Sequence, residues 1–131
     1  MAATCVAKVD VLLSGLGNEI ERRVRFATTN TPEAVNAGYG TIAAADTYEA
    51  IVLGQVAAST IDLLYLKSID QTIYVYTASV APAGNAAQIT LAASEACLFR
   101  PAVSTGVAVS IMVASGTAEA KYEYIVVGQS S

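Results

Sequence analysis

The sequence predicts an all-β fold, an antiparallel β-sandwich or jelly roll of about nine strands. Apolar and polar residues alternate with a period of two along most of the chain, which is typical of strands with one buried face. Turn-forming residues recur at short intervals, and no segment has the apolar period of a long helix. Because 131 residues suit one domain, we expect a single β-sandwich domain over residues 1–131.

The first predicted strand covers Cys5–Leu13, where all five odd-numbered residues are apolar. We expect this row to be buried against the rest of the domain. Gly15 and Gly17 then predict a turn into the next strand.

The second predicted strand covers Glu19–Phe26 and is the only charge-dense strand. Its even-numbered residues Ile20, Val24 and Phe26 are expected to point inward, and Arg22 interrupts them. An inward arginine needs a carboxylate partner or a route to solvent. The charged row consists of Glu19, Glu21, Arg23 and Arg25. This row is either a solvated strand face or a contact with an adjacent subunit, and we place Glu21, Arg23 and Arg25 in such a contact.

The segment Thr28–Thr41 is rich in turn-forming residues and is predicted to be a long loop. At 14 residues it exceeds the usual connection in a compact domain, and long loops are often functional. The inner faces of a sandwich are committed to its core, so contacts with neighbours come from edges, loops and outward side chains. Pro32 and Tyr39 are therefore candidate interface residues.

Seven further strands are predicted after this loop. A tight corner at residues 68–71 and the pair Ser115–Gly116 each predict a hairpin turn between the strands that flank them. The predicted strands are Thr47–Val56, Ile61–Ile69, Thr72–Ala78, Gln88–Ala92, Ala96–Arg100, Val107–Ala114 and Ala118–Val127. The side chains expected in the core are Leu64, Leu66, Val75, Ile89, Leu98, Ile111, Val113 and Ile125.

Tyr74 and Tyr76 fall on one face of their predicted strand, and Tyr122 and Tyr124 repeat this spacing in the last strand. An aromatic ladder can stack on sugar rings or bases. It can equally form cross-strand pairs in a half-buried sheet or supply area at a subunit interface. Because the chain has no tryptophan to support a sugar site, we assign Tyr74 and Tyr76 to an interface.

The composition argues against several classes of function. Hydrophobic residues reach 54% and charged residues only 14%, so few charges are present to coat a free monomer. The net charge of −4 argues against nucleic-acid binding, and no segment has the length and apolarity of a membrane span. There is no histidine, and the arginines beside Glu19 and Glu21 would hold both carboxylates ionised. We therefore expect no enzyme activity, no catalytic residue, no cofactor and no metal site.

The chain contains two cysteines, Cys5 and Cys97, each in an apolar setting. Neither has a second cysteine at metal-ligand spacing. Buried free thiols are the simpler interpretation, and the sequence leaves a disulfide between them open.

Four segments resemble small β-sandwich virion proteins of tailed bacteriophages. They are IDLLYLKSID (61–70), IYVY (73–76), QITLAASEACLFRP (88–101) and AEAKYEYIVV (118–127), and together they cover about the second half of the chain. The chain departs from the family pattern at Ser68, where asparagine is common, and at Leu91–Glu95, which lacks a Pro-Gly turn.

This resemblance implies a non-enzymatic structural part of a particle, most simply a capsid decoration (cement) protein that bridges neighbouring capsomers. A head–tail or tail component is the alternative within the same class, and a carbohydrate- or host-surface-binding module is the alternative outside it. The expected partners are copies of the same chain, as a homo-oligomer and most simply a trimer, together with the major capsid protein or other virion proteins. The expected location is the virion, after assembly in the host cytoplasm.

Overall fold

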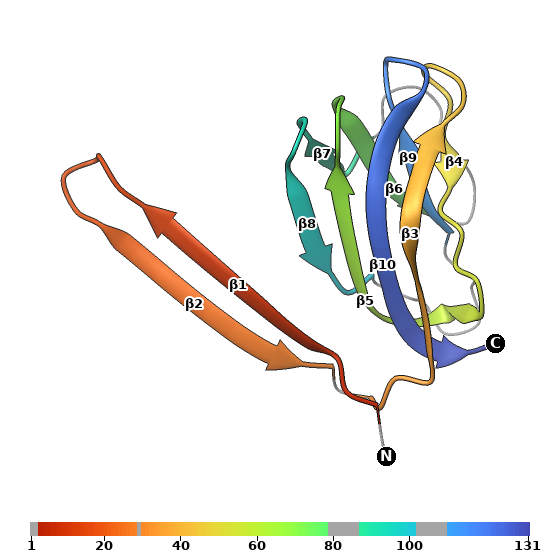
Figure 1. The fold of residues 1–131 in the computed structure, drawn as a ribbon, viewed down its shortest axis with the longest axis horizontal. Coiled ribbons are helices and arrows are strands. Elements are labelled where there is room, and N and C mark those ends of the chain that lie inside the picture. The colour runs from red at the N-terminus through yellow and green to blue at the C-terminus, as the bar shows by residue number, and fades with distance from the viewer. Residues whose placement is uncertain (1–2, 29, 79–86, 102–109) are drawn as a thin grey trace.

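The computed structural model of the protein describes residues 3–28, 30–78, 87–101 and 110–131. These residues form ten strands and no helix, and every strand pair is antiparallel, so the predicted all-β class is confirmed (Figure 1). The strands are β1 (Val6–Leu13), β2 (Ile20–Ala27), β3 (Ala34–Ile42), β4 (Glu49–Ala50), β5 (Val56–Ser68), β6 (Ile73–Ala78), β7 (Ile89–Leu91), β8 (Ala96–Phe99), β9 (Ser110–Ala114) and β10 (Ala120–Ser130).

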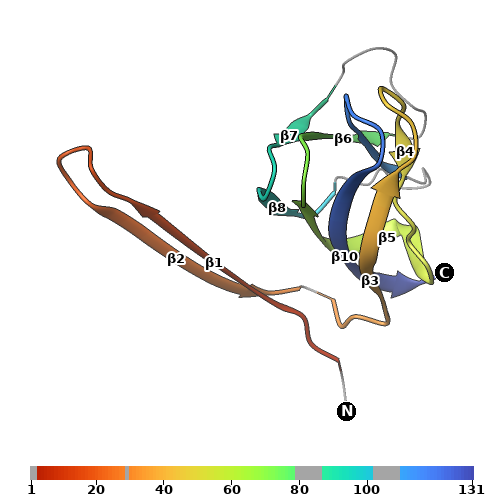
Figure 2. The same cartoon turned by 45° about the horizontal axis from the view of Figure 1, so that its top comes forward.

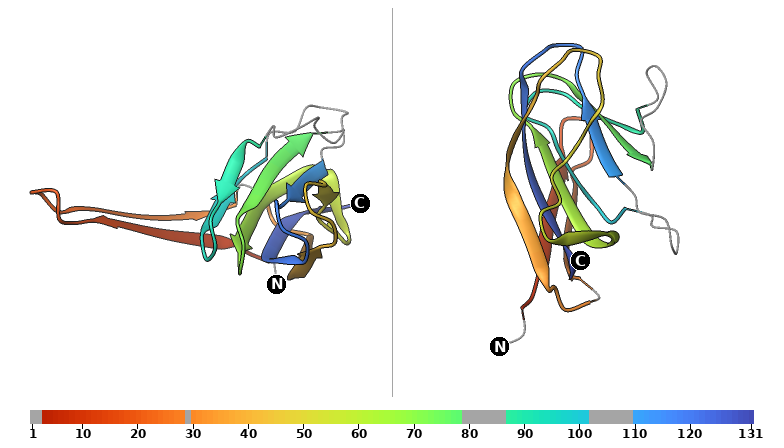
Figure 3. Two further views of the ribbon diagram at one scale, coloured as in Figure 1. Left: turned by 90° about the horizontal axis from the view of Figure 1, so that it is seen from above. Right: turned by 90° about the vertical axis from the view of Figure 1, so that its right-hand side faces the viewer.

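Eight strands form a β-sandwich of two four-stranded sheets. The front sheet, nearest the viewer in Figure 1, has the order β3-β10-β5-β8, and the back sheet has the order β4-β9-β6-β7. The right-hand view of Figure 3 shows the two sheets as separate layers. Antiparallel strands that expose one face and bury the other produce the alternation seen in the sequence.

The core lies between the two sheets. Leu64 and Leu66 of β5 and Val75 of β6 are completely or almost completely buried there, as are Ile111 and Val113 of β9. These five core predictions are confirmed. Burial of side chains of this size stabilises the fold by roughly 1.5–3 kcal/mol each.

The other three core predictions are less successful. Ile89 is partly buried against the core, and Leu98 is partly buried against a smaller cluster on the outward side of the front sheet. The prediction for Ile125 is wrong, because it is 39% exposed on that outward side. In β10 the even-numbered Tyr122 and Tyr124 face inward instead.

Two glycines of β3 make room for these inward tyrosines. Gly40 pairs with Tyr122 and Gly38 with Tyr124 in the β3–β10 register. A Cβ atom on Gly40 would collide with the Tyr122 ring, whereas one on Gly38 would make an ordinary contact with the Tyr124 hydroxyl at 3.7 Å. Each ring therefore lies across the cross-strand glycine, an arrangement that compensates for its missing side chain.

The predicted loop at 28–41 is wrong over most of its length, because Ala34–Ile42 forms β3 at the edge of the front sheet. Its glycines, which predict turns on their own, are the glycines that accommodate the tyrosines. The strand predicted at Thr47–Val56 is also largely absent. Only Glu49–Ala50 pairs there, and Gly54, with φ of 60°, turns the chain before β5 begins at Val56.

The two predicted hairpin turns are crossings between sheets. The corner at 69–72 leads from β5 in the front sheet to β6 in the back sheet, and 115–119 leads from β9 back to β10. Polar side chains hold these corners together. Ser115 Oγ donates a hydrogen bond to the Thr72 carbonyl at 2.8 Å, and Asp70 Oδ1 accepts one from the Lys121 amide at 2.8 Å. The segment 102–109, which includes the start of the strand predicted at Val107–Ala114, lies outside the described residues.

The strands β1 and β2 do not join the sandwich. They pair with each other, from Val6 opposite Ala27 to Leu13 opposite Ile20, and form a separate two-stranded arm. Figure 1 and Figure 2 show that this arm projects away from the sandwich on the side of β8. The sequence correctly predicts both strands, but not their separation from the core.

Candidate interaction surface

The arm is amphipathic. The register places the odd-numbered residues of β1 beside the even-numbered residues of β2, which gives one almost wholly apolar face. We call it the apolar face of the arm, and it consists of Ala7, Val9, Val11, Leu13, Ile20, Val24 and Phe26, together with Arg22. The opposite face carries the cross-strand pairs Lys8–Arg25, Asp10–Arg23 and Leu12–Glu21.

The apolar face is uncovered for most of its length. Val11 and Val24 are 56% and 52% exposed, and Leu13, Ile20 and Phe26 are exposed as well. The prediction that these residues point into a core is therefore wrong within the single chain. The alternation that predicts a buried face is present, but nothing among the described residues covers it. The exposed contiguous apolar surface makes this face the candidate interaction surface of the chain.

Local chemistry explains why the hairpin nevertheless forms. Val, Ile and Phe favour strands, and the alternation of apolar and charged residues is consistent along both of them. Gly15 and Gly17 adopt φ of 89° and 96° in the connecting turn, a region that glycine enters without strain. Nothing within 4 Å would meet a side chain at either glycine, so the tip of the arm is open.

The root of the arm is attached to the outward side of the front sheet. Ala7, the one buried residue of the apolar face, packs with Leu63 of β5 and Val127 of β10. Cys5 and Leu98 are partly buried against the same cluster. The apolar face is thus continuous at its root with the apolar surface of the sandwich.

A buried carboxylate fixes the chain where it passes from the arm to β3. Asp62 Oδ1 accepts a hydrogen bond from Asn30 Nδ2 at 2.9 Å, and its Oδ2 accepts one from Gln129 Nε2 at 3.2 Å. Arg100 Nη2 lies 3.7 Å from Oδ1. Gln129 Nε2 also donates to the Thr31 carbonyl at 3.0 Å. A buried charge with several partners is costly to disturb, so these bonds hold Asn30 and Thr31 against the sandwich.

A groove of about 580 Å³ opens between the root of the arm and the outward side of the front sheet. Residues from Cys5 to Asp10 form one wall. Leu63, Tyr65, Ile125 and Val127 are among the residues of the other wall. The groove is mainly apolar, and its charged lining residues are Lys8 and Asp10 of β1.

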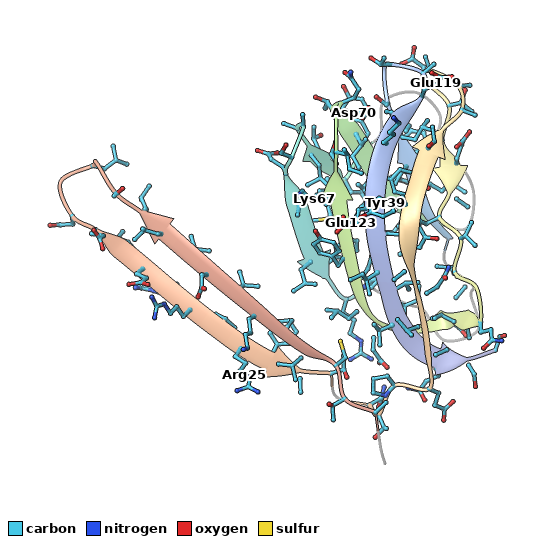
Figure 4. The ribbon with its side chains drawn as sticks, viewed as in Figure 1. Arg25, Tyr39, Lys67, Asp70, Glu119 and Glu123 are labelled. Atoms are coloured by element: carbon cyan, nitrogen blue, oxygen red, sulfur yellow. The ribbon has the colours of Figure 1, made fainter. Side chains whose placement is uncertain are left out.

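The outward face of the front sheet is a second partly apolar surface. Tyr39 and Val35 of β3 are strongly exposed, at 75% and 63%, and Ile125 of β10 lies between them and β5. Figure 4 labels Tyr39, Lys67 and Glu123 on this sheet, where the register sets them side by side. Burial raises the pKa of Tyr65, and a hydrogen bond to Glu123 raises it further.

The predicted interface residues occupy three different places. Glu21, Arg23 and Arg25 lie on the charged face of the arm, and Figure 4 shows Arg25 on the far side of the arm from the sandwich. Arg23 Nη2 lies 2.6 Å from Glu21 Oε1, and Arg23 Nε lies 3.8 Å from Asp10 Oδ1. Because the Arg23 side chain is strongly exposed, these ion pairs contribute little to stability. Tyr39 lies on the outward face of the front sheet, and Pro32 is half-buried in the connection before β3.

Tyr74 and Tyr76 are separated from both of these surfaces. They are half-buried on β6 of the back sheet, opposite the buried Ile73 and Val75. The Tyr76 ring meets Tyr48 edge to face, with centroids 6.3 Å apart. The structure therefore does not combine the tyrosine pair with the arm in one site.

Both cysteines are free thiols in the structure and line the groove. Burial raises the pKa of Cys97 to about 11, and burial together with the charge of Asp62 raises that of Cys5. Thiolates are the reactive form, so neither cysteine is activated for nucleophilic chemistry.

Two searches for other kinds of site give negative results within the described residues. No group of three or more cysteine, aspartate or glutamate side chains is placed to hold a metal ion. The described segments also include no helix that is long and apolar enough to cross a membrane.

Comparison of the chain with protein-family models, with curated proteins and with solved structures finds no match.

The sequence analysis placed Glu21, Arg23 and Arg25 on one charged face, as the register confirms, but did not predict that the apolar face is uncovered. The signal was present, because Arg22 interrupts a row that is otherwise suited to a core. Arg22 is exposed in the structure, which is the route to solvent that an arginine in this row requires.

Proposed function

We propose that this chain is a structural subunit of a virus particle, a capsid decoration protein that bridges neighbouring capsomers. The observation that carries the structural role is the arm, whose apolar face is built like the inner face of a sheet but is uncovered in the single chain. The assignment to a virion rests on the resemblance of residues 61–127 to small β-sandwich virion proteins of tailed bacteriophages.

The physical argument for assembly starts from the weakness of a lone hairpin. Two strands without further support are at best marginally stable in water, and they need a third strand or a packed face. Beyond its root the arm has neither among the described residues. A partner that covers the apolar face would stabilise the arm and gain its own binding energy from the same burial.

The low charge content fits this role. A subunit whose surface is largely covered by other copies and by a capsid shell needs fewer charged groups than a free monomer. The partners we propose are copies of the chain, most simply in a trimer, and the major capsid protein or another virion protein. The binding energy of such contacts comes from buried area and strand pairing, so the proposed role requires no catalytic step.

A carbohydrate-binding role gains no support from the geometry of Tyr74 and Tyr76. A sugar platform requires aromatic faces that are exposed and flat. Tyr74 and Tyr76 are half-buried, and Tyr76 packs against Tyr48.

The proposal is tested by purifying particles from the host that produces this chain and measuring its copy number by quantitative mass spectrometry. A structural subunit is expected at a copy number that matches particle symmetry, and a density map should place it on the head surface. Regular positions in the neck or tail would replace the decoration role by the tail alternative. Absence from purified particles would contradict the proposed function.

A further inference from the structure

We infer that the partner of the apolar face is a second copy of this chain. In this arrangement the arm of one copy lies on the outward face of the front sheet of the next copy. The inference deepens the proposed function and rests on it for its biological setting, but the contact itself is a property of the purified chain.

The first argument is the match in chemistry between the two surfaces. The apolar face of the arm offers valine, leucine, isoleucine and phenylalanine. The outward face of the front sheet offers Val35, Tyr39, Tyr65 and Ile125, all at least partly exposed. Both are faces of twisted antiparallel sheets, and such faces pack on one another at about 10 Å.

The second argument is length. The eight residues of β1 span roughly 25 Å. The outward residues of β10 from Lys121 to Val127 span roughly 20 Å along the sheet. An arm laid along the sheet would therefore cover most of this face and leave the tip at Gly15–Gly17 free.

The third argument is charge. The arm, residues 3–28, has four basic residues and three acidic ones, a net charge of +1. The rest of the chain has three basic and eight acidic residues, a net charge of −5, and the two parts together give the chain's −4. An arm that approaches another copy's sandwich is thus attracted, whereas two sandwiches repel each other.

The charge pattern also fits at a smaller scale. Arg22 is the one charged residue of the apolar face, and no carboxylate among the described residues forms an ion pair with it. The outward face of the front sheet carries Glu123 near its middle, flanked by Tyr39 and Lys67. Within the described part of the single chain the Arg22 guanidinium donates only to the Glu21 carbonyl, at 2.9 Å, and docking of the arm would bring it to a face that holds a carboxylate.

The root of the arm explains why the contact is with another copy and not with the arm's own sheet. The hydrogen bonds of Asp62 to Asn30 and Gln129 fix the chain at the root. From there the arm leads past the β8 edge and away from the sandwich, as the left-hand view of Figure 3 shows. In this position the arm covers its own front sheet only at the root, where Ala7 packs with Leu63 and Val127.

A contact between two different surfaces repeats from copy to copy and closes into a ring when the rotation allows it. Three copies linked in this way would form the expected trimer. Each arm would then be the third layer on its neighbour's sandwich.

The first experiment measures the mass of the purified full-length chain by analytical ultracentrifugation. Val11→Asp places a charge on the apolar face, and Leu12→Lys places one on the charged face at an adjacent and similarly exposed position. Each new charge faces an opposite one across the hairpin, Arg22 and Glu21 respectively, so the hairpin itself is retained in both variants. We expect the wild type and Leu12→Lys to be oligomeric. The dissociation constant for self-association of Val11→Asp should be at least tenfold higher than that of the wild type.

The second experiment identifies the receiving surface. The background variant lacks both native cysteines, and its thermal melt confirms that it folds. Val24→Cys is introduced into one copy of this variant and Ile125→Cys into another. The two copies carry different tags and are co-expressed. A disulfide between the two tagged chains supports the inference. Three results would overturn it: a monomeric wild type, an oligomer that Val11→Asp leaves intact, or cross-links that join arm only to arm.

These outcomes are separable from those of the proposed function. A chain that assembles through its arm but is absent from purified particles would contradict the virion role and leave the arm contact standing. A chain that is present in particles but monomeric when purified, and unaffected there by Val11→Asp, would leave the virion role and overturn the arm contact.

Discussion

The arm and the sandwich are built from the same kind of sequence, and yet only one of them buries its apolar residues within the chain. In β5 of the sandwich, Leu64 and Leu66 are completely buried between two sheets. In β1 of the arm, Val9 and Val11 show the same alternation and remain exposed. Alternation therefore reports that a face is suited to burial, and does not report whether the covering surface belongs to the same molecule.

The largest expected contrast comes from one type of substitution made in both regions. Val113→Asp places a carboxylate between the sheets, where burial of an unpaired charge costs several kcal/mol or more. We expect loss of soluble, folded protein, as measured by yield and circular dichroism. The same change at Val11 should leave the sandwich folded, with a melting temperature close to that of the wild type. A folded Val113→Asp variant would show that this position is not part of the core.

The glycines of β3 allow the packing of the sandwich to be tested more finely. Gly40→Ala would press a Cβ atom into the Tyr122 ring, and overpacking of this kind costs about 1–3 kcal/mol. Gly38→Ala is the matched control, because its Cβ would make only an ordinary contact with Tyr124. We expect urea unfolding to show a clear loss of stability for the first and no loss for the second. Equal effects would contradict the proposed fit of ring over glycine.

Asp62 lies where the arm joins the sandwich, so its replacement should affect both the stability of the sandwich and the position of the arm. Asp62→Ala removes the acceptor for Asn30 and Gln129 and should cost about 1–3 kcal/mol in unfolding free energy. Asp62→Asn keeps one acceptor oxygen and should cost less. Small-angle scattering should show a broader distribution of maximum dimensions for the alanine variant at protein concentrations where it is monomeric. An unchanged distribution would show that the root is held by other contacts.

A smaller effect is expected from Cys97, which lies beside the groove at the junction of the two regions. Burial raises its pKa to about 11, whereas an unfolded thiol titrates near 8.5. The folded state thus holds the proton more tightly, and stability should fall as the pH rises from about 9 to 11. The melting temperature of Cys97→Ala should decline less steeply over this interval. An identical slope for the two proteins would exclude a contribution from this thiol.

The smallest effect on folding is expected on the charged face of the arm. Arg23 and Arg25 are exposed, so their replacement by glutamate should change the thermal melt very little. Replacing both arginines by glutamate changes the net charge of the arm from +1 to −3. This should slow its association with a sandwich of negative charge. Co-sedimentation with particles and self-association should both weaken, most of all at low salt. Unchanged association at low salt would show that this face is only solvated.

The success of sequence-based prediction varied with the physical signal available. Strands β1, β2, β5 and β6 were predicted because period-two alternation is a local property. The inward row of β10 was assigned wrongly because both rows carry large apolar or aromatic residues. Lys121 and Glu123 in the outward row were a local signal for the observed orientation, and the glycines of β3 provide the space for Tyr122 and Tyr124.

Other features depend on pairing and could not be found from local pattern. The corner at 69–72 has the composition of a hairpin turn, but whether a chain folds back or crosses to a second sheet depends on strands far away in the sequence. The same holds for the arm. Its charged residues Glu21, Arg23 and Arg25 could be recognised, whereas its exposure follows from the pairing, since none of the other described strands lies beside it.

Hydrogen–deuterium exchange of the arm, measured as a function of protein concentration, tests the central claim most directly. The amides of β1 and β2 belong to a hairpin that is marginal alone and supported when it lies on a second copy. We predict that their protection rises with concentration, in parallel with that of the outward residues of β3, while the core strands β5 and β9 stay protected throughout. Arm protection that is the same in the monomer and at high concentration would contradict the account.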